Sequence, residues 1–186
     1  MMTPTSRKIL ILTACAVLIP FCAQADVPAD VKNAFEKAGL PLIKEARLSP
    51  DWTLGTLDGK TIRLSQLQGK IVFLNFWATW CPPCRAEMPS IEALYQRFKD
   101  KGIEFFAVDI AENAKTVQKI VQAQKLHFPV LLDSSGSVGG DYNIQAIPVT
   151  VIVDRDGKMI LSSVGARSWN SPAIIAAFET LAAHGR

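Results

Sequence analysis

The chain has 186 residues, of which 49% are hydrophobic and 20% are charged, with 20 Lys and Arg residues against 17 Asp and Glu residues. This composition is typical of a folded domain with a sizeable core and excludes a disordered or low-complexity chain. The basic residues form no concentrated patch, so no nucleic-acid partner is expected.

Residues 1–25 are predicted to be a secretory signal peptide. Arg7 and Lys8 precede an apolar run from Ile9 to Cys22, and Ala23-Gln24-Ala25 then supplies an A-x-A cleavage site. The run is shorter than the ~20 apolar residues that a membrane-spanning helix needs. We therefore expect an exported protein, in the periplasm or on the outer face of the cell membrane. Two alternatives stay open: an uncleaved signal that anchors the chain, or cleavage before Cys15 with a lipid on that cysteine.

Export changes how the four cysteines are interpreted. Cys15 and Cys22 lie within the signal segment, where small apolar residues are expected. The mature chain then retains only Cys81 and Cys84, so it has no framework of structural disulfides. Its one cysteine pair has a spacing suited to chemistry.

After the signal, the hydrophobic pattern predicts alternating helices and strands. A helix over 30–38 and a linker make residues 26–48 a segment that precedes one domain, residues 49–186. Two short strands around Asp58-Gly59 predict a β-hairpin. Further strands are expected at 70–77, 103–110, 130–132, 149–153 and 158–164, and helices at 83–98, 115–124, 138–142 and 172–183. This order predicts an α/β fold with a mixed central sheet flanked by helices.

Cys81-Pro82-Pro83-Cys84 lies between the buried strand expected at 70–77 and the helix that follows. A C-x-x-C sequence near a βαβ pattern is typical of thioredoxin-like redox motifs. The free N–H groups and the dipole at the start of the helix favour the thiolate of Cys81, so we expect Cys81 to be the attacking sulfur. Cys84, about one turn further on and less exposed, is expected to resolve the mixed disulfide.

Three other features are candidates for the site. Pro148, between Ile147 and a buried strand, fits a turn with either a trans or a cis peptide bond. Glu87, three residues after Cys84, either compensates the helix dipole or is a partly buried acid that exchanges protons with the cysteines. Trp80 is a candidate for an apolar partner surface next to Cys81. Trp169 is interpreted as a packing residue.

No metal ion and no cofactor are expected. Structural zinc usually takes four Cys or His ligands, whereas the mature chain offers two cysteines with His127 and His184, neither at ligand spacing. A Cu(I)-binding assembly module that uses Cys81 and Cys84 stays an alternative, since thiolates are soft ligands. A peroxiredoxin-type peroxidase is not expected, because Ala78 occupies the place of the Thr or Ser that precedes the reactive cysteine in such enzymes.

The segment 75–89, NFWATWCPPCRAEMP, resembles the active-site segment of the TlpA/ResA-like family of thioredoxin-fold thiol–disulfide oxidoreductases. The similarity extends over nearly all of the mature chain. It implies a thioredoxin-like fold with an N-terminal β-hairpin extension and a helix–strand insertion near residues 112–132. It also implies that Pro148 is cis and faces the cysteines, and that the backbone of Ile147 pairs with an extended substrate. With Trp80 and Pro82, these two residues form the expected substrate-binding set.

The resemblance also implies a function. We expect an extracytoplasmic protein-disulfide reductase that cycles Cys81 and Cys84 between dithiol and disulfide, with a membrane electron donor of the DsbD or CcdA type. Its disulfide-containing clients would include apocytochromes c. Asn75 replaces the buried Asp of cytosolic thioredoxin, which makes Glu87 the better candidate for proton transfer. A dithiol oxidase, which differs only in its reduction potential, is the alternative.

Overall fold

The protein is represented by a computed structural model that describes residues 27–184. The predicted signal peptide, with Cys15 and Cys22, lies outside these residues. The strands are β1 (Arg47–Leu48), β2 (Thr53–Thr56), β3 (Thr61–Arg63), β4 (Ile71–Trp77), β5 (Ile103–Ile110), β6 (Val130–Asp133), β7 (Val149–Val153) and β8 (Lys158–Val164). The helices are α1 (Ala29–Lys37), α2 (Pro82–Phe98), α3 (Ala114–Ala123), α4 (Ser137–Asp141) and α5 (Pro172–Ala183), with a 3-10 turn at Leu64–Leu67. Within 27–184, no helix is long and apolar enough to cross a bilayer.

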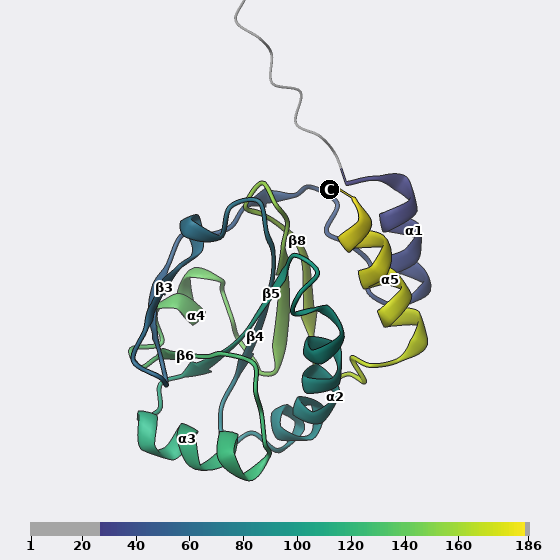
Figure 1. Cartoon of the computed structure of the whole chain (residues 1–186). Coiled ribbons are helices and arrows are strands. Elements are labelled where there is room, and N and C mark those ends of the chain that lie inside the picture. Colours follow the sequence, from purple (N-terminus) through teal and green to yellow (C-terminus); the bar gives the residue numbers. More distant parts are fainter. Residues whose placement is uncertain (1–26, 185–186) are drawn as a thin grey trace, which may run out of the picture.

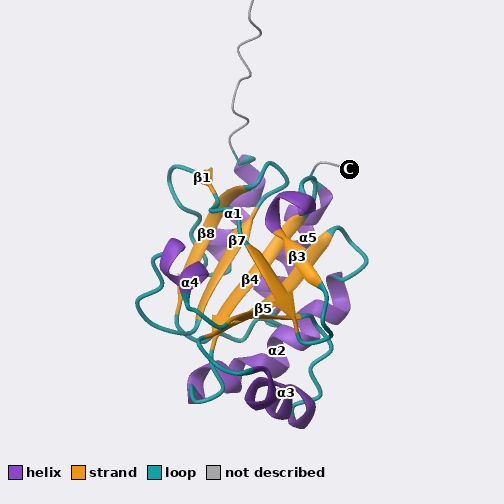
Figure 2. Ribbon diagram, turned by 90° about the vertical axis from the view of Figure 1, so that its left-hand side faces the viewer, coloured by secondary structure: helices purple, strands orange, loops and turns teal. Residues whose placement is uncertain are grey.

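The eight strands form one mixed sheet in the order β1-β8-β7-β4-β5-β6-β2-β3. Helices α1, α2 and α5 cover one face, and the short α4 lies on the other (Figures 1 and 2). The β2–β3 hairpin extends the sheet beyond β6, and α3 with β6 forms the helix–strand insertion, as the family resemblance implies. The predicted α/β fold with a mixed sheet is confirmed.

Strand β4 is the centre of the sheet. It pairs in parallel with β5 and antiparallel with β7, and all seven of its residues are buried. A strand covered on both faces needs a nearly continuous apolar sequence, which β4 has. The chain leaves the carboxyl end of β4 and enters α2 after only a few residues. This short connection places the C-x-x-C sequence at the carboxyl end of the central strand.

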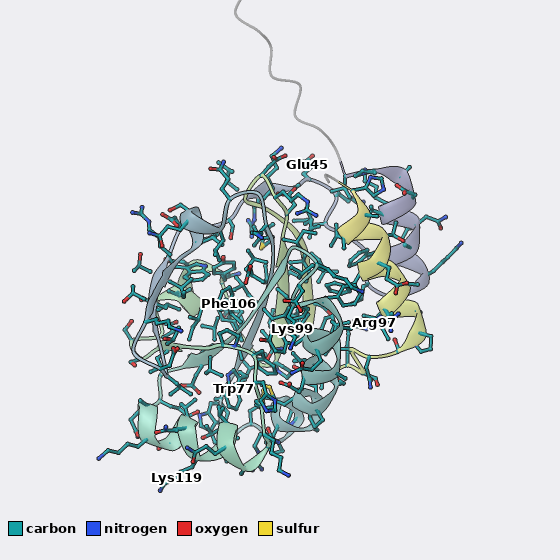
Figure 3. The ribbon with its side chains drawn as sticks, in the orientation of Figure 1. Glu45, Trp77, Arg97, Lys99, Phe106 and Lys119 are labelled. Atoms are coloured by element: carbon teal, nitrogen blue, oxygen red, sulfur yellow. A yellow bond between two sulfur atoms is a disulfide. The ribbon has the colours of Figure 1, made fainter. Side chains whose placement is uncertain are left out.

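Apolar side chains fill both faces of the sheet. Trp77 of β4 belongs to the cluster under α1, α2 and α5, whereas Phe106 of β5 belongs to the cluster toward α4 and the hairpin. Figure 3 shows these two labelled side chains inside the fold and Lys119 of α3 extending into solvent. The sheet is therefore held rigidly from both sides, and its carboxyl edge is a fixed platform for the cysteines.

The N-terminal segment 27–48 joins this same core. Helix α1 lies along α5 (Figure 1), and Val31 and Phe35 are fully buried, with the Phe35 ring 5.6 Å from that of Phe178. Strand β1 pairs with β8, so the expected linker contains a strand. A strand of two residues is too short to produce a hydrophobic period, which explains why the sequence did not predict it.

Candidate active site

Cys81 and Cys84 occupy the start of α2. Cys81 is the N-cap residue, and its Sγ accepts the backbone N–H of Cys84 at 3.3 Å. Pro82 and Pro83 fill the first helical positions, where a missing N–H leaves no bond unmade. A disulfide joins the two cysteines, whose Cα atoms are 5.3 Å apart, so the structure represents the oxidised state. Cys84 is fully buried and Cys81 is 3% exposed, which matches the expected order by a small margin.

Pro148 directly precedes β7, the strand that pairs with β4. The Ile147–Pro148 peptide bond is cis, as the family resemblance implies. The carbonyl oxygen of Ile147 lies 3.8 Å from Sγ of Cys81. The register of β7 against β4 pairs Val149 with Phe76, which brings the start of β7 beside the end of β4. Two segments that are more than sixty residues apart in the sequence therefore meet at one sulfur atom.

An open hollow lies beside Cys81. Its lining is mostly apolar and consists of Trp80, Cys81, Pro82, Pro83, Ile110 and residues 144–147. Trp80 is 68% exposed, so its ring contributes a large apolar surface that the fold leaves uncovered. Three of the four predicted substrate-binding residues, Trp80, Pro82 and Ile147, line this hollow, and Pro148 follows directly in the chain.

Glu87 is a buried acid, 3% exposed, on the turn of α2 that follows Cys84. Its Oε1 accepts Nδ2–H of Asn75 at 2.8 Å, and its Oε2 accepts the backbone N–H of Arg167 and Nε1–H of Trp169, both at 3.0 Å. Burial raises the pKa of Glu87, and the hydrogen bonds from Asn75, Trp169 and Arg167 oppose that rise. The burial agrees with the second interpretation of Glu87, and its proton exchange with the cysteines stays a prediction.

Residues 46–162 match the AhpC/TSA family. The chain belongs to this family. It is 39% identical over 130 residues to the thiol-disulfide oxidoreductase ResA of Bacillus cereus, an alignment that covers 70% of this chain and 73% of that protein.

Two solved structures support this assignment. A thiol:disulfide interchange protein of the thioredoxin family from Chlorobium tepidum has a TM-score of 0.63 and 26% identity, covering 77% of this chain and 98% of that one. A secreted Mycobacterium tuberculosis disulfide oxidoreductase, described as homologous to Escherichia coli DsbE, has a TM-score of 0.60 and 28% identity, covering 68% and 95%. The AhpC/TSA family protein is a thiol–disulfide oxidoreductase with a thioredoxin-like fold, as predicted.

Two residues that bind the Glu87 carboxylate, Arg167 and Trp169, were not predicted from the sequence as part of the site. Trp169, interpreted as a packing residue, does pack edge-on against Phe73 at 5.1 Å, but it also donates to the Glu87 carboxylate. Arg167 contributes a backbone N–H, which no side-chain pattern can reveal. Both lie about eighty residues from Glu87 in the chain, so only the fold brings them together.

The residues considered for metal binding are not gathered in one place. Within 27–184, no group of three or more His, Cys, Asp or Glu residues could hold a metal ion. His127 pairs with Glu92 through Nδ1 at 3.0 Å, and His184 pairs with Asp30 through Nε2 at 2.6 Å. Each histidine therefore has a carboxylate partner of its own.

Proposed function

We propose that this oxidoreductase is an extracytoplasmic protein-disulfide reductase in which Cys81 attacks and Cys84 resolves. The observation that carries the proposal is the position of Cys81. Its sulfur receives an N–H at the start of α2, lies against the Ile147 carbonyl next to cis-Pro148, and borders an open apolar hollow. A sulfur placed there is stabilised as a thiolate and can be reached by a partner.

The cycle starts from the dithiol. The Cys81 thiolate attacks one sulfur of a client disulfide, forms a mixed disulfide and expels the other client sulfur as a thiolate. Cys84 then attacks Sγ of Cys81, which releases the second client thiol and leaves the Cys81–Cys84 disulfide that the structure contains. The client gains two electrons and the protein loses two. A membrane electron donor of the DsbD or CcdA type returns them.

Glu87 is the proposed proton acceptor of the resolving step. Cys84 is fully buried, so its thiol needs a nearby base before it can attack. Glu87 lies one helical turn further along α2, and its raised pKa brings it closer to the working pH than an exposed glutamate would be. Asn75 and Trp169 hold the carboxylate in place from the sheet and from the loop before α5.

Trp80, Pro82, Ile147 and Pro148 form the proposed client-binding surface. The hollow that they border is open and apolar, which suits an extended peptide that carries apolar residues next to its cysteine. The backbone of Ile147, next to the cis bond, would pair with that peptide. Trp80 adds contact area without a role in the core, because most of its side chain faces solvent.

The predicted signal peptide supports an extracytoplasmic location, and the similar M. tuberculosis protein is described as secreted. In that compartment, the clients would be disulfide-containing proteins, with apocytochromes c among them. The resemblance to the TlpA/ResA-like group supports this part of the proposal.

Equilibration of the purified protein with glutathione buffers tests the direction of electron flow. A reductase should have a midpoint potential below about −200 mV, toward thioredoxin at about −270 mV. A potential near about −120 mV, as in DsbA, would instead support the dithiol oxidase. The Cys84→Ser variant, which cannot form the internal disulfide, is the control.

A further inference from the structure

A tight turn over residues 78–81 connects the end of β4 to the start of α2 and ends at Cys81. The backbone N–H of Cys81 donates to the carbonyl oxygen of Ala78 at 3.2 Å, so Thr79 and Trp80 are the two central residues of the turn. The geometry of this turn sets both the position of the reactive sulfur and the direction of the exposed Trp80 ring.

Glu112, in the loop between β5 and α3, holds this turn with both carboxylate oxygens. Oε2 accepts the backbone N–H of Thr79 at 2.5 Å, and Oε1 accepts the Thr79 hydroxyl at 2.6 Å. The backbone N–H of Thr79, which follows Ala78 in the turn, has no acceptor within the turn itself, and Glu112 supplies one. Two charge-assisted hydrogen bonds to one residue fix both its backbone and its side chain.

Asp109 lies in β5 just before Glu112 and is fully buried. Neither of its carboxyl oxygens meets a hydrogen-bond donor in good geometry. The titratable groups that act on it are both acids: Glu112 and, at the end of β6, Asp133. Asp133 is occupied, since it accepts the Gly139 N–H at 2.8 Å and the Ser135 hydroxyl at 3.4 Å.

A neutral, protonated Asp109 avoids a buried negative charge that has no donor in good geometry and that lies beside two other acids. Burial first, and then the Glu112 side chain, raise the pKa of Asp109 to about 8, although the nearby backbone N–H of Glu112 opposes the rise. Two neighbouring carboxyl groups in a buried place do not both remain charged, and the protonated one becomes a hydrogen-bond donor to the other. A protonated Asp109 would donate to the Glu112 carboxylate, whose two oxygens still accept both donors of Thr79.

We propose that Glu112 is a positioning residue for the attacking cysteine, and that Asp109 carries the proton that holds the Glu112 carboxylate against the turn. The inference rests on the proposed role of Cys81 as the attacking sulfur. It gives the site a second pair of acidic residues, with a role distinct from that of Glu87. Loss of the Asp109 proton places a second negative charge beside Glu112, which loosens the turn at alkaline pH.

The test is the thiolate titration of Cys81, followed by ultraviolet absorbance at 240 nm in a reduced Cys84→Ser background. Glu112→Gln should shift this titration by about 0.5 pH unit or more, because a neutral amide cannot accept both Thr79 donors as a carboxylate does. Asp109→Leu, which removes the donor to Glu112, should shift it in the same way. Asp109→Asn keeps a donor and should follow the wild-type curve below about pH 7, but without the further inflection near the pKa of Asp109.

Glu104→Gln, which removes a half-buried charge from the same strand, is the matched control and should leave the curve unchanged. If Glu112→Gln and Asp109→Leu also leave it unchanged, the positioning role is wrong. If either variant fails to fold, as circular dichroism would show, Thr79→Val decides the matter with the same readout, since it removes only the hydroxyl donor. The absence of any titrating thiolate at Cys81 in the reduced Cys84→Ser protein itself would instead overturn the proposed function.

Discussion

Replacing Asp109 with Asn should flatten the pH dependence of stability between pH 5 and 8. In the folded protein, burial and the neighbouring Glu112 raise the pKa of Asp109 to about 8, whereas an aspartate in the unfolded chain has a pKa near 3.9. Between these values, the folded state binds a proton that the unfolded state has lost. The free energy of unfolding therefore decreases as the pH rises, and this contribution is lost from the slope when the residue cannot titrate.

The linkage relation sets the size of the effect. One proton held by the folded state alone changes the free energy of unfolding by at most about 1.4 kcal/mol per pH unit, or about 3 kcal/mol between pH 5 and 7. Asn has nearly the same shape as Asp and keeps a donor toward Glu112. Any constant cost of the substitution shifts the whole curve and leaves its slope unaffected.

Urea denaturation of the oxidised protein at pH 5, 6, 7 and 8, followed by tryptophan fluorescence, measures these slopes. The disulfide keeps cysteine ionisation out of the comparison. Glu104→Gln, on the same strand, is the control and should run parallel to the wild type. Parallel curves for the wild type and Asp109→Asn would show that Asp109 holds no extra proton in the fold, and would refute the reasoning.

Three further predictions follow from the site and the core. Glu87→Gln should slow the resolving step by about 10²-fold, seen on non-reducing gels as a longer-lived mixed disulfide; an unchanged lifetime would remove Glu87 from proton transfer. Trp80→Ala should slow reduction of a peptide disulfide but not of glutathione disulfide, while the free energy of unfolding changes by only about 0.5 kcal/mol, because the ring is exposed; equal slowing with both substrates would argue against a client-binding role. Phe35→Ala should cost about 3–5 kcal/mol in urea denaturation, because the ring is fully buried against α5; a loss below about 1 kcal/mol would mean that α1 is not part of the cooperative fold.

The sequence predicted the parts of the fold whose signals are local. Strand β4 is a continuous apolar run, and the start of α2 has two prolines directly after Cys81, so both elements were placed within a residue of their observed bounds. The C-x-x-C spacing likewise predicted the cysteine pair that the structure shows as a disulfide. These features depend on neighbours in the chain, which periodicity and turn chemistry can reveal.

The supporting contacts were not predictable in the same way. Trp169 reaches Glu87 across 82 positions, and Glu112 reaches Thr79 across 33. Each residue looks ordinary in its own segment: one is an aromatic before a helix, and the other is an acid in a loop. Only the crossover from β4 to β5, and the loop that leads into α5, bring these groups to Thr79 and Glu87. The sequence thus predicts the candidate cysteines, and the fold determines which groups surround the elements that carry them.

The most direct test of the redox cycle is mixed-disulfide trapping with a defined oxidised peptide. Reduced Cys84→Ser protein should form one stable covalent adduct with the peptide through Cys81, because the resolving thiol is missing. Cys81→Ser, which keeps only the buried Cys84, should form none under the same conditions. Adducts of equal yield with both variants, or with neither, would contradict the assignment of Cys81 as the attacking sulfur and Cys84 as the resolving one.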